Sequence, residues 1–188
     1  MIRALLDTCV LFKPLVCDAL LSIAEENAFR PLWSRDILDE LRGSLVRAGV
    51  VPESVEHRIA QMRTHFPGAD VDGYEDLIRG MTNDPKDRHV LAAAVRGNAE
   101  AIVTENVRDF PASAVECYDI AVMDQDEFFL DLYDLDPAAV TRGLTRQVSR
   151  YRRDPRSVED LLIALGNCGN GCPQFARLCH TERFGGSC

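Results

Sequence analysis

Two kinds of hydrophobic pattern alternate along the first two-thirds of the chain. Short, nearly continuous apolar runs are typical of strands that are buried on both faces. Between these runs, apolar residues recur every three or four positions, which predicts amphipathic helices. The predicted strands are residues 4–12, 70–72, 101–104 and 120–123. Because strands that alternate with helices form parallel sheets, the pattern predicts an α/β fold, a three-layer sandwich whose central parallel sheet is covered on both faces.

Capping residues mark the ends of several predicted helices. Ser34 is a good N-cap for a helix over residues 35–48, and Gly49 is a typical stop signal after it. Pro52 favours the first turn of the next helix, because proline lacks the backbone N–H that this turn leaves unbonded in any case. The other helices predicted in this part of the chain are residues 17–27, 74–79, 87–98 and 127–133.

The pattern changes after residue 134, where the predicted strands end. From there on it predicts helices only, over residues 138–153 and residues 158–165, the second of which begins at a capping-box-like segment. We therefore expect an α/β domain over residues 1–134 and a small all-helical C-terminal extension over residues 135–188.

The charge of the chain is acidic and unevenly distributed. There are 21 Lys and Arg against 30 Asp and Glu, which gives a net charge of −9. From Leu135 onward the count is 8 basic against 5 acidic residues, so the preceding part has the remaining 13 and 25. Phosphate contacts usually need Lys and Arg, and composition alone therefore does not favour RNA as a ligand. An acidic body can still bind RNA if its carboxylates bind metal ions, which reverse the local field.

Arg142, Arg146 and Arg150 recur every four residues and form a basic stripe on the first helix of the extension, supplemented by Arg152, Arg153 and Arg156. Such a stripe fits RNA phosphates or an acidic partner. Charge runs are more often solvated helix faces, and we favour that interpretation by roughly two to one.

The apolar runs are too short to predict a membrane-spanning helix. Asp7 follows the first few apolar residues directly and leaves no room for the core of a signal peptide. We therefore expect a cytoplasmic protein without a membrane segment.

Four acidic residues stand where a parallel sheet could bring them together. Asp7 interrupts the first predicted strand, and Asp109 lies in the loop after the strand at residues 101–104. Asp87 lies in the first turn of the helix that leads into that strand, and Glu40 lies beside the apolar stripe of its helix. Sites in open parallel sheets form outside the carboxyl ends of the strands. Clustered carboxylates need compensating cations, and all-oxygen sites suit Mg²⁺ or Mn²⁺.

Spacing alone does not establish such a site, because the chain has 30 acidic residues and some will lie near helix ends by chance. The helix dipole explains an acid at Asp87 without any metal. Asp7 is harder to explain in this way, since an acid within an apolar strand is costly to bury and indicates a partner. His89 is expected to be a packed or surface histidine rather than a general base.

At these acids the sequence resembles the PIN domain family, and more closely its VapC-like toxins. The order, the intervals and the local residues fit, and the last two of the four segments are the more specific. The segments are Leu5-Leu6-Asp7-Thr8-Cys9-Val10-Leu11, Ile37-Leu38-Asp39-Glu40-Leu41, Asp84-Pro85-Lys86-Asp87-Arg88-His89-Val90-Leu91-Ala92-Ala93-Ala94 and Val103-Thr104-Glu105-Asn106-Val107-Arg108-Asp109-Phe110-Pro111. The resemblance covers about the first two-thirds of the chain, and the rest is similar to the helical C-terminal extension of some PIN proteins.

The resemblance implies an α/β/α sandwich and Mg²⁺- or Mn²⁺-dependent cleavage of RNA by an activated water. It implies that the catalytic and metal-binding residues are Asp7, Glu40, Asp87 and Asp109. It further implies that Thr104 and Asn106 orient the site and that Asp84 is an outer acid. In toxin–antitoxin pairs a small antitoxin blocks the nuclease, so the resemblance also implies a cognate antitoxin partner and a homodimer.

Cysteines raise two further questions. The family often has Asn or a small polar residue at position 9, whereas this chain has Cys9; a thiol is a poor ligand for Mg²⁺, so we expect Cys9 to pack. The tail contains Cys168, Cys172, Cys179, His180 and Cys188. Their spacing is not a standard zinc pattern, and thiols without zinc are favoured by roughly four to one.

Three other functions are consistent with parts of the pattern. A non-catalytic PIN-like module that binds RNA or protein would have no need for four acids together. A structure-specific DNA nuclease of the same fold is usually larger. A Mg²⁺-dependent small-molecule phosphatase is expected to have an Asp-x-Asp motif at the first strand, which Asp7-Thr8-Cys9 lacks.

Overall fold

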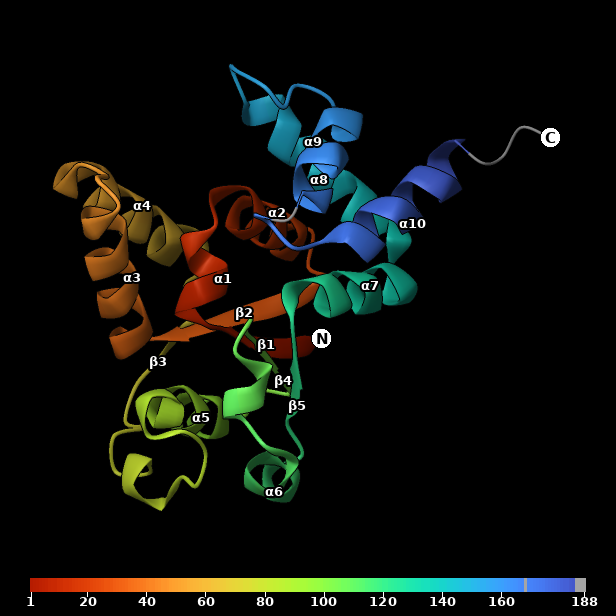
Figure 1. Ribbon diagram of the computed structural model, residues 1–188. Helices are drawn as coiled ribbons and strands as arrows, with labels where there is room; N and C mark the ends of the chain where they lie inside the picture. The colour runs from red at the N-terminus through yellow and green to blue at the C-terminus, as the bar shows by residue number, and fades with distance from the viewer. Residues whose placement is uncertain (168, 185–188) are drawn as a thin grey trace. The chain divides into compact units, whose positions relative to one another are not determined.

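The computed structural model of the chain describes residues 1–167 and 169–184, and its contacts divide them into two units (Figure 1). One unit, here called the sheet unit, consists of residues 2–12 and 30–123. The other, here called the helical unit, consists of Met1, residues 13–29 and the residues from Asp124 onward. Each unit is described by itself.

The sheet unit is built on five strands in the order β3-β2-β1-β4-β5. The strands are β1 Ile2–Leu6, β2 Phe29–Ser34, β3 Asp70–Val71, β4 Ala101–Val103 and β5 Ala121–Met123. The pairings of β1 with β4, of β2 with β3 and of β4 with β5 are parallel. Leu6 lies opposite Val103, and Val103 lies opposite Met123, so the carboxyl ends of these three strands coincide.

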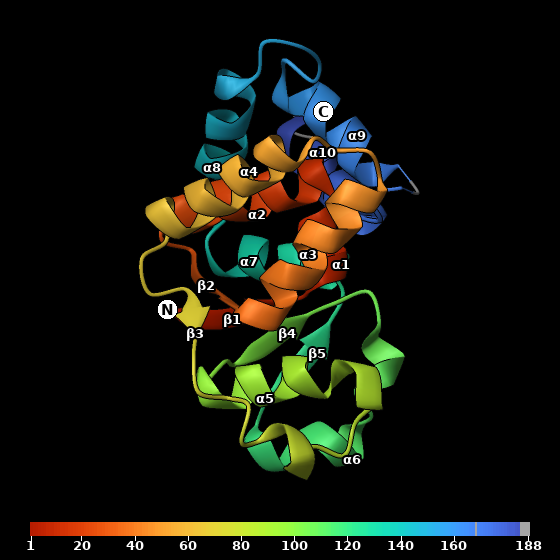
Figure 2. The same ribbon diagram turned by 90° about the vertical axis from the view of Figure 1, so that its left-hand side faces the viewer.

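Helices cover both faces of this sheet. Figure 2 shows α1, α3 and α4 on one side of the strands and α5 and α6 on the other. Their bounds are α1 Thr8–Phe12, α3 Arg35–Arg47, α4 Pro52–His65, α5 Arg88–Arg96 and α6 Ala112–Val115. The alanines of α5 explain its close contact with β1 and β4, since Ala92, Ala93 and Ala94 are completely buried. The central strands are buried as well, which agrees with their uninterrupted apolar sequences.

Short 3₁₀ helices lie in the loops of the sheet unit and position several polar residues. They are η1 Ile78–Gly80, η2 Pro85–Asp87, η3 Val107–Asp109 and η4 Glu116–Tyr118. The predicted N-cap of α3 is confirmed, because the Ser34 hydroxyl accepts a hydrogen bond from the Ile37 N–H over 3.2 Å.

The helical unit packs five helices around an apolar core. The helices are α2 Pro14–Glu25, α7 Gln125–Leu135, α8 Pro137–Arg150, α9 Val158–Gly166 and α10 Pro173–Phe184. The rings of Phe129 and Phe175 stack with their centroids 4.7 Å apart. The buried carboxylate of Asp126 accepts hydrogen bonds from the N–H groups of Gln174, over 3.0 Å, and Phe175, over 2.8 Å. These two hydrogen bonds satisfy backbone N–H groups in the first turn of α10, which have no partner within the helix itself.

The arginine stripe of α8 is exposed to solvent and is also paired with acids at the end of α2. The Arg142 side chain donates to Glu26 over 2.8 Å, and Arg150 donates to Glu25 over 2.6 Å. Arg146 lies between them and donates to Glu26 over 2.5 Å. The hydrogen bond from Arg142, together with Arg146, lowers the pKa of Glu26. The three arginines therefore join two helices of one unit while their side chains stay exposed, which agrees with the solvated-face interpretation.

The structure differs from the predicted elements in four places. Residues 8–12, predicted as the end of a strand, form helix α1, because the N–H groups of Val10 and Leu11 turn back to the Asp7 carbonyl. Strand β2 was not predicted, since Arg30 and Pro31 interrupt its apolar run. Helix α10 lies in the tail for which no helix was predicted, and at residues 74–79 only the short η1 overlaps the predicted helix.

None of the described helices is both long enough and apolar enough to cross a membrane. Of the cysteines in the tail, Cys172 and Cys179 are buried, while Cys168 and Cys188 lie outside the described residues. The structural units do not end where the predicted domains do, and the boundary at residue 134 stays a prediction.

Candidate active site

Asp7 lies at the carboxyl end of β1 and is almost completely buried, with 4% of its surface exposed. Its backbone N–H donates to the Val103 carbonyl over 3.1 Å, which continues the pairing of β1 with β4 by one residue. Its two carboxylate oxygens accept hydrogen bonds from the Thr8 N–H and from the Thr104 hydroxyl, both over 2.6 Å. The burial of this charge is thus compensated by donors from both strand ends.

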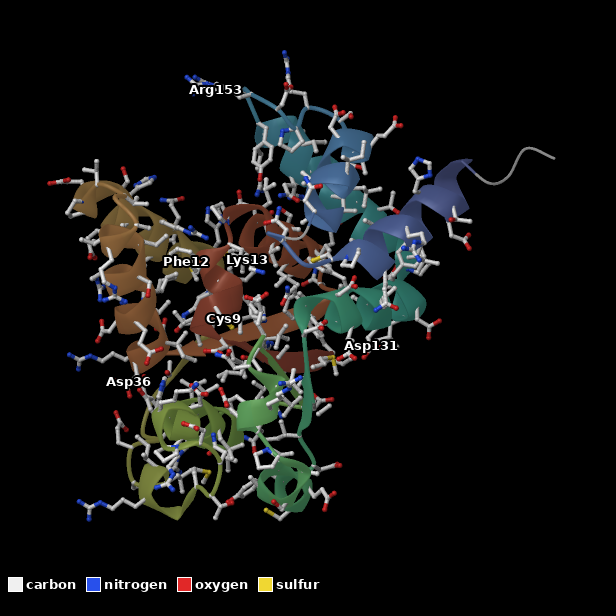
Figure 3. All side chains as sticks on the ribbon, in the orientation of Figure 1. Cys9, Phe12, Lys13, Asp36, Asp131 and Arg153 are labelled. Atoms are coloured by element: carbon white, nitrogen blue, oxygen red, sulfur yellow. The ribbon has the colours of Figure 1, made fainter. Side chains whose placement is uncertain are left out.

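Cys9, in α1, completes this arrangement (Figure 3). Its Sγ lies 3.3 Å from an Asp7 oxygen and accepts a hydrogen bond from the Glu105 N–H over 3.2 Å. Burial, and then the negative charge of Asp7, raise the pKa of Cys9 to about 12. The residue is therefore a neutral thiol that donates to Asp7, which supports the expectation that it packs rather than binds a metal.

Asp87 and Asp109 come together beside Asp7. Asp87 is the last residue of η2 and is 9% exposed. Burial raises its pKa to about 6, with further contributions from the charge of Asp7 and a hydrogen bond with Asp109. Asp109 is the last residue of η3, and the Lys86 ammonium 2.9 Å from it lowers its pKa. Three of the predicted acids therefore interact electrostatically at the ends of β1 and β4.

Glu40 lies next to this group and is joined to it through Thr8. The Thr8 hydroxyl donates to one Glu40 oxygen over 2.9 Å, and the His89 Nε2 lies 3.1 Å from the other. The hydrogen bond from His89 is the main cause of the lowered pKa of Glu40. Because Thr8 follows Asp7 in the chain, its side chain places Glu40 at the rim of the site.

Thr104, Asn106 and Asp84, the polar residues expected around the four acids, have different roles in the structure. Thr104 is completely buried and bonds Asp7 directly. Asn106 reaches the site through its backbone, since its N–H donates to the Thr104 hydroxyl over 3.1 Å. Asp84 caps η2 by accepting from the Lys86 N–H, and its own N–H donates to the Asp109 carbonyl over 3.0 Å. Asp84 thus joins the loops that position Asp87 and Asp109.

His89, Thr8 and Lys86 are the contacts that sequence reasoning missed. His89 was expected to be a packed or surface histidine; its side chain is 13% exposed and lies 3.1 Å from Glu40. The signal for it is present in the sequence: it lies two residues after Asp87, in the first turn of α5. Nothing local indicates Glu40 as its partner, because α3 and α5 are distant in the chain.

The donor chemistry of the group fits a hard divalent cation. One Asp87 oxygen is buried and has no hydrogen-bond partner within the described part of the chain. All candidate ligands are carboxylate oxygens, which Mg²⁺ and Mn²⁺ prefer. The side chains are not arranged as a finished ligand set, since residues 1–167 and 169–184 contain no group of three or more acids, cysteines or histidines positioned around a single ion. The Lys86 ammonium instead compensates part of the negative charge of Asp109, and the Thr104 hydroxyl donates a hydrogen bond to Asp7.

Comparison with known proteins identifies the class. The model of the PIN domain matches residues 3–108, more than half of the chain, and the chain belongs to the PIN domain family. The model of the VapC50 C-terminal domain matches residues 125–181, which contain most of the helical unit. The expected family and its helical extension are therefore confirmed.

A particular relative is similar over part of this length. The chain is 46% identical over 104 residues to the protein named "Putative ribonuclease VapC50" of Mycobacterium tuberculosis (strain ATCC 25618 / H37Rv). The aligned region is 55% of this chain and 60% of the relative, so it spans less than two thirds of the relative's length. No solved structure matches the chain.

Proposed function

We propose that the chain is a metal-dependent endoribonuclease and the toxin of a toxin–antitoxin pair. The observation that carries this proposal is the group formed by Asp7, Asp87 and Asp109 at the ends of two adjacent strands. Burial, and after it the charge of Asp7 and a hydrogen bond with Asp109, raise the pKa of Asp87 to about 6, as expected for a carboxylate enclosed beside other acids. Membership of the PIN family and similarity to a protein named a ribonuclease support the same conclusion.

In the proposed site, Asp7, Asp87 and Asp109 hold Mg²⁺ or Mn²⁺, and Glu40 lies at its edge. When bound, such an ion supplies positive charge for the scissile phosphate and makes a water molecule more acidic. Thr104 and Cys9 hold the Asp7 carboxylate in one orientation, and Thr8 and His89 do the same for Glu40. Electrostatic preorganisation of this kind is usually the largest contribution to catalysis.

The proposed reaction is hydrolysis of an RNA phosphodiester. Water attacks phosphorus in line, the bond to the 3′ oxygen breaks, and the products are a 5′-phosphate and a 3′-hydroxyl. The Lys86 ammonium, 63% exposed and 2.9 Å from Asp109, is placed to move from the carboxylate to a phosphate oxygen when the acids bind cations.

The test is Mn²⁺-dependent cleavage of labelled structured RNAs by the wild type and by Asp7→Asn. Asp72→Asn is the matched control, because it removes the same charge from an exposed residue of the sheet unit. Cleavage by the wild type and the control but not by Asp7→Asn supports the proposal. Mapping of the product ends should give 5′-phosphates; a 2′,3′-cyclic phosphate would contradict hydrolysis by water.

The same experiment separates the other candidates. Single- and double-stranded DNA are included, and preferential cleavage of DNA would favour a DNA nuclease. If no variant cleaves although the folded protein has metal present, a non-catalytic binding module is the better conclusion. The antitoxin, the homodimer and the cytoplasmic location are proposed from the family resemblance. The antitoxin and the homodimer can be tested by co-expressing the chain with the adjacent reading frame and measuring the mass of the purified protein by analytical sedimentation.

A further inference from the structure

The loop between α8 and α9 is the most basic feature of the helical unit. Its sequence, Tyr151-Arg152-Arg153-Asp154-Pro155-Arg156-Ser157, has three arginines and one aspartate in a chain of net charge −9. Arg153 lies at the outer tip of this loop (Figure 3). Positive charge is thus concentrated in one exposed segment, which is unusual in an acidic protein.

The arginines of this loop differ from those of α8 in their pairing. Those of the stripe donate to Glu25 and Glu26, which compensates their charge within the unit. Arg152, Arg153 and Arg156 are exposed, and no ion pair joins them to any acid in the described part of the chain. Folding therefore does not use their guanidinium groups, which are available to a ligand.

A shallow, open cavity of about 440 Å³ is lined by two of these arginines, Arg152 and Arg153. Its walls combine the guanidinium-bearing Arg152 and Arg153 with the rings and aliphatic atoms of Pro14, Leu15, Tyr151 and Pro155. The Tyr151 hydroxyl donates to Asp18 over 2.8 Å and accepts from the Gln147 side chain over 2.8 Å, which fixes its ring. Two acids, Asp18 and Asp154, also line the cavity, and Asp18 accepts the hydrogen bond from Tyr151.

We infer that this loop binds the backbone of single-stranded RNA, with Arg152, Arg153 and Arg156 on phosphates and the cavity accepting a nucleoside. Arginine forks bind phosphate oxygens through two hydrogen bonds, and planar or apolar side chains accept bases without regard to their identity. An acidic peptide would use the arginines but has no need of the apolar walls. The choice of RNA rests on the proposed function.

The experiment measures binding of a fluorescent single-stranded RNA, about 20 nucleotides long so that it exceeds one binding site, to the full chain at several salt concentrations. It is done in the Asp7→Asn background, so that cleavage does not disturb the measurement. The test variant is Arg152→Gln/Arg153→Gln/Arg156→Gln. The matched control is Arg47→Gln/Arg79→Gln/Arg177→Gln, which removes the same charge from exposed positions elsewhere. A second variant, Arg152→Lys/Arg153→Lys/Arg156→Lys, retains the charge, and circular dichroism checks that each variant folds.

The Gln variant should bind roughly tenfold to a hundredfold more weakly at low salt, and its log–log salt slope should fall by about 2, since each phosphate contact on a single strand contributes about 0.7. The control should change little, and the Lys variant should retain most of the slope. Equal losses in the test and control variants would overturn the inference, because bulk charge would then account for both.

Two further measurements distinguish RNA binding by the loop from protein binding and from failure of the ribonuclease proposal. If a polyglutamate peptide loses at least as much affinity as RNA in the Gln variant, the loop is a protein-binding surface and the inference is wrong. RNA cleavage by the wild type is measured separately. If the wild type cleaves RNA and the Gln variant binds RNA as tightly as its parent, only the inference about the loop is contradicted. If the Gln variant loses RNA binding but neither the wild type nor any variant cleaves RNA, the ribonuclease proposal is contradicted and the RNA-binding surface remains supported.

Discussion

One of the donors that orient the Asp7 carboxylate is the hydroxyl group of a residue at the end of the adjacent strand. Thr104 is completely buried, and its hydroxyl donates to Asp7 over 2.6 Å. The same oxygen accepts from the Asn106 N–H, so that it links the two strand ends to the following loop. A buried carboxylate that loses a donor is destabilised by more than the hydrogen bond itself contributes in water.

Thr104→Val should therefore lower the free energy of unfolding by about 1–3 kcal/mol, because it keeps the shape of the side chain and removes the donor to a buried charge. Urea unfolding at pH 7 measures the change, and RNA cleavage should fall with it. Thr104→Ser retains the hydroxyl and is the control. Equal stability of the Val and Ser variants would mean that the hydrogen bond does not orient Asp7.

At the scale of elements, α2 and α8 approach each other closely at Gly143. A Cβ atom added to Gly143 would lie 2.7 Å from Cγ1 and 2.8 Å from Cα of Ile23. The Cα atom belongs to the backbone of a helix and cannot move aside cheaply. Only glycine therefore permits the two helices to approach so closely.

Gly143→Ala should destabilise the protein by about 1–3 kcal/mol through overpacking, although alanine is the better helix former. Gly43→Ala is a matched control in the middle of α3. There the added Cβ meets only the end of the flexible Arg47 side chain at 3.2 Å, and the change should stabilise by about 0.5–1 kcal/mol. Thermal and urea unfolding measure both. Stabilisation by Gly143→Ala would refute the close approach of α2 and α8.

The ion pairs between the same two helices should make stability depend on pH in the acid range. The pKa of Glu26 is lowered by Arg142 and Arg146, so the folded state favours the ionised form. Its contribution to stability is complete above the unfolded pKa of about 4.5 and is lost as the pH falls through the lower folded value.

Glu26→Gln should therefore flatten the decrease in unfolding free energy that the wild type shows below about pH 4.5, the ordinary pKa of this carboxyl. Urea unfolding at closely spaced pH values measures it. Glu159→Gln, at an exposed position of α9, controls for the loss of one carboxylate. A profile of Glu26→Gln that parallels the wild type would show that the arginines do not stabilise the ionised carboxylate.

For the whole molecule, the decisive property is the negative charge gathered at one edge of the sheet. Asp7, Asp87 and Asp109 repel one another, and Lys86 compensates only part of their charge. A cation that binds them in the folded state stabilises it by mass action, since the unfolded chain has no such group of ligands.

Addition of Mn²⁺ to protein first treated with EDTA should raise the melting temperature. At a free Mn²⁺ concentration of roughly a hundred times the dissociation constant, binding stabilises the folded state by about 3 kcal/mol. Asp87→Asn should abolish most of the increase, and Asp72→Asn should retain it. Differential scanning calorimetry measures the effect independently of RNA cleavage. An equal increase in Asp87→Asn would place the bound metal elsewhere.

Features that depend only on residues close together in the chain could be predicted from the amino-acid sequence alone. The apolar runs at β1, β4 and β5, the Ser34 cap of α3 and the helix at α5 belong to this group, since strand burial, capping and helical periodicity are local properties. Asp87 and Asp109 could be selected because they lie near the ends of predicted elements, and Asp7 because it interrupts an apolar strand. Glu40 was selected from its place beside the apolar stripe of its helix. The large number of acids in the chain meant that only the family resemblance distinguished these four from the others.

Features that depend on residues far apart in the chain became known only from the folded structure. The apolar run after Asp7 suits a strand or a helix equally, and α1 forms because β1 ends where its pairing with β4 ends. The capping of α10 comes from Asp126, and the pairing of His89 with Glu40 and of Arg142 with Glu26 joins separate helices. No local pattern records such partners, because the sheet order and helix packing that bring them together arise from burial of the whole chain.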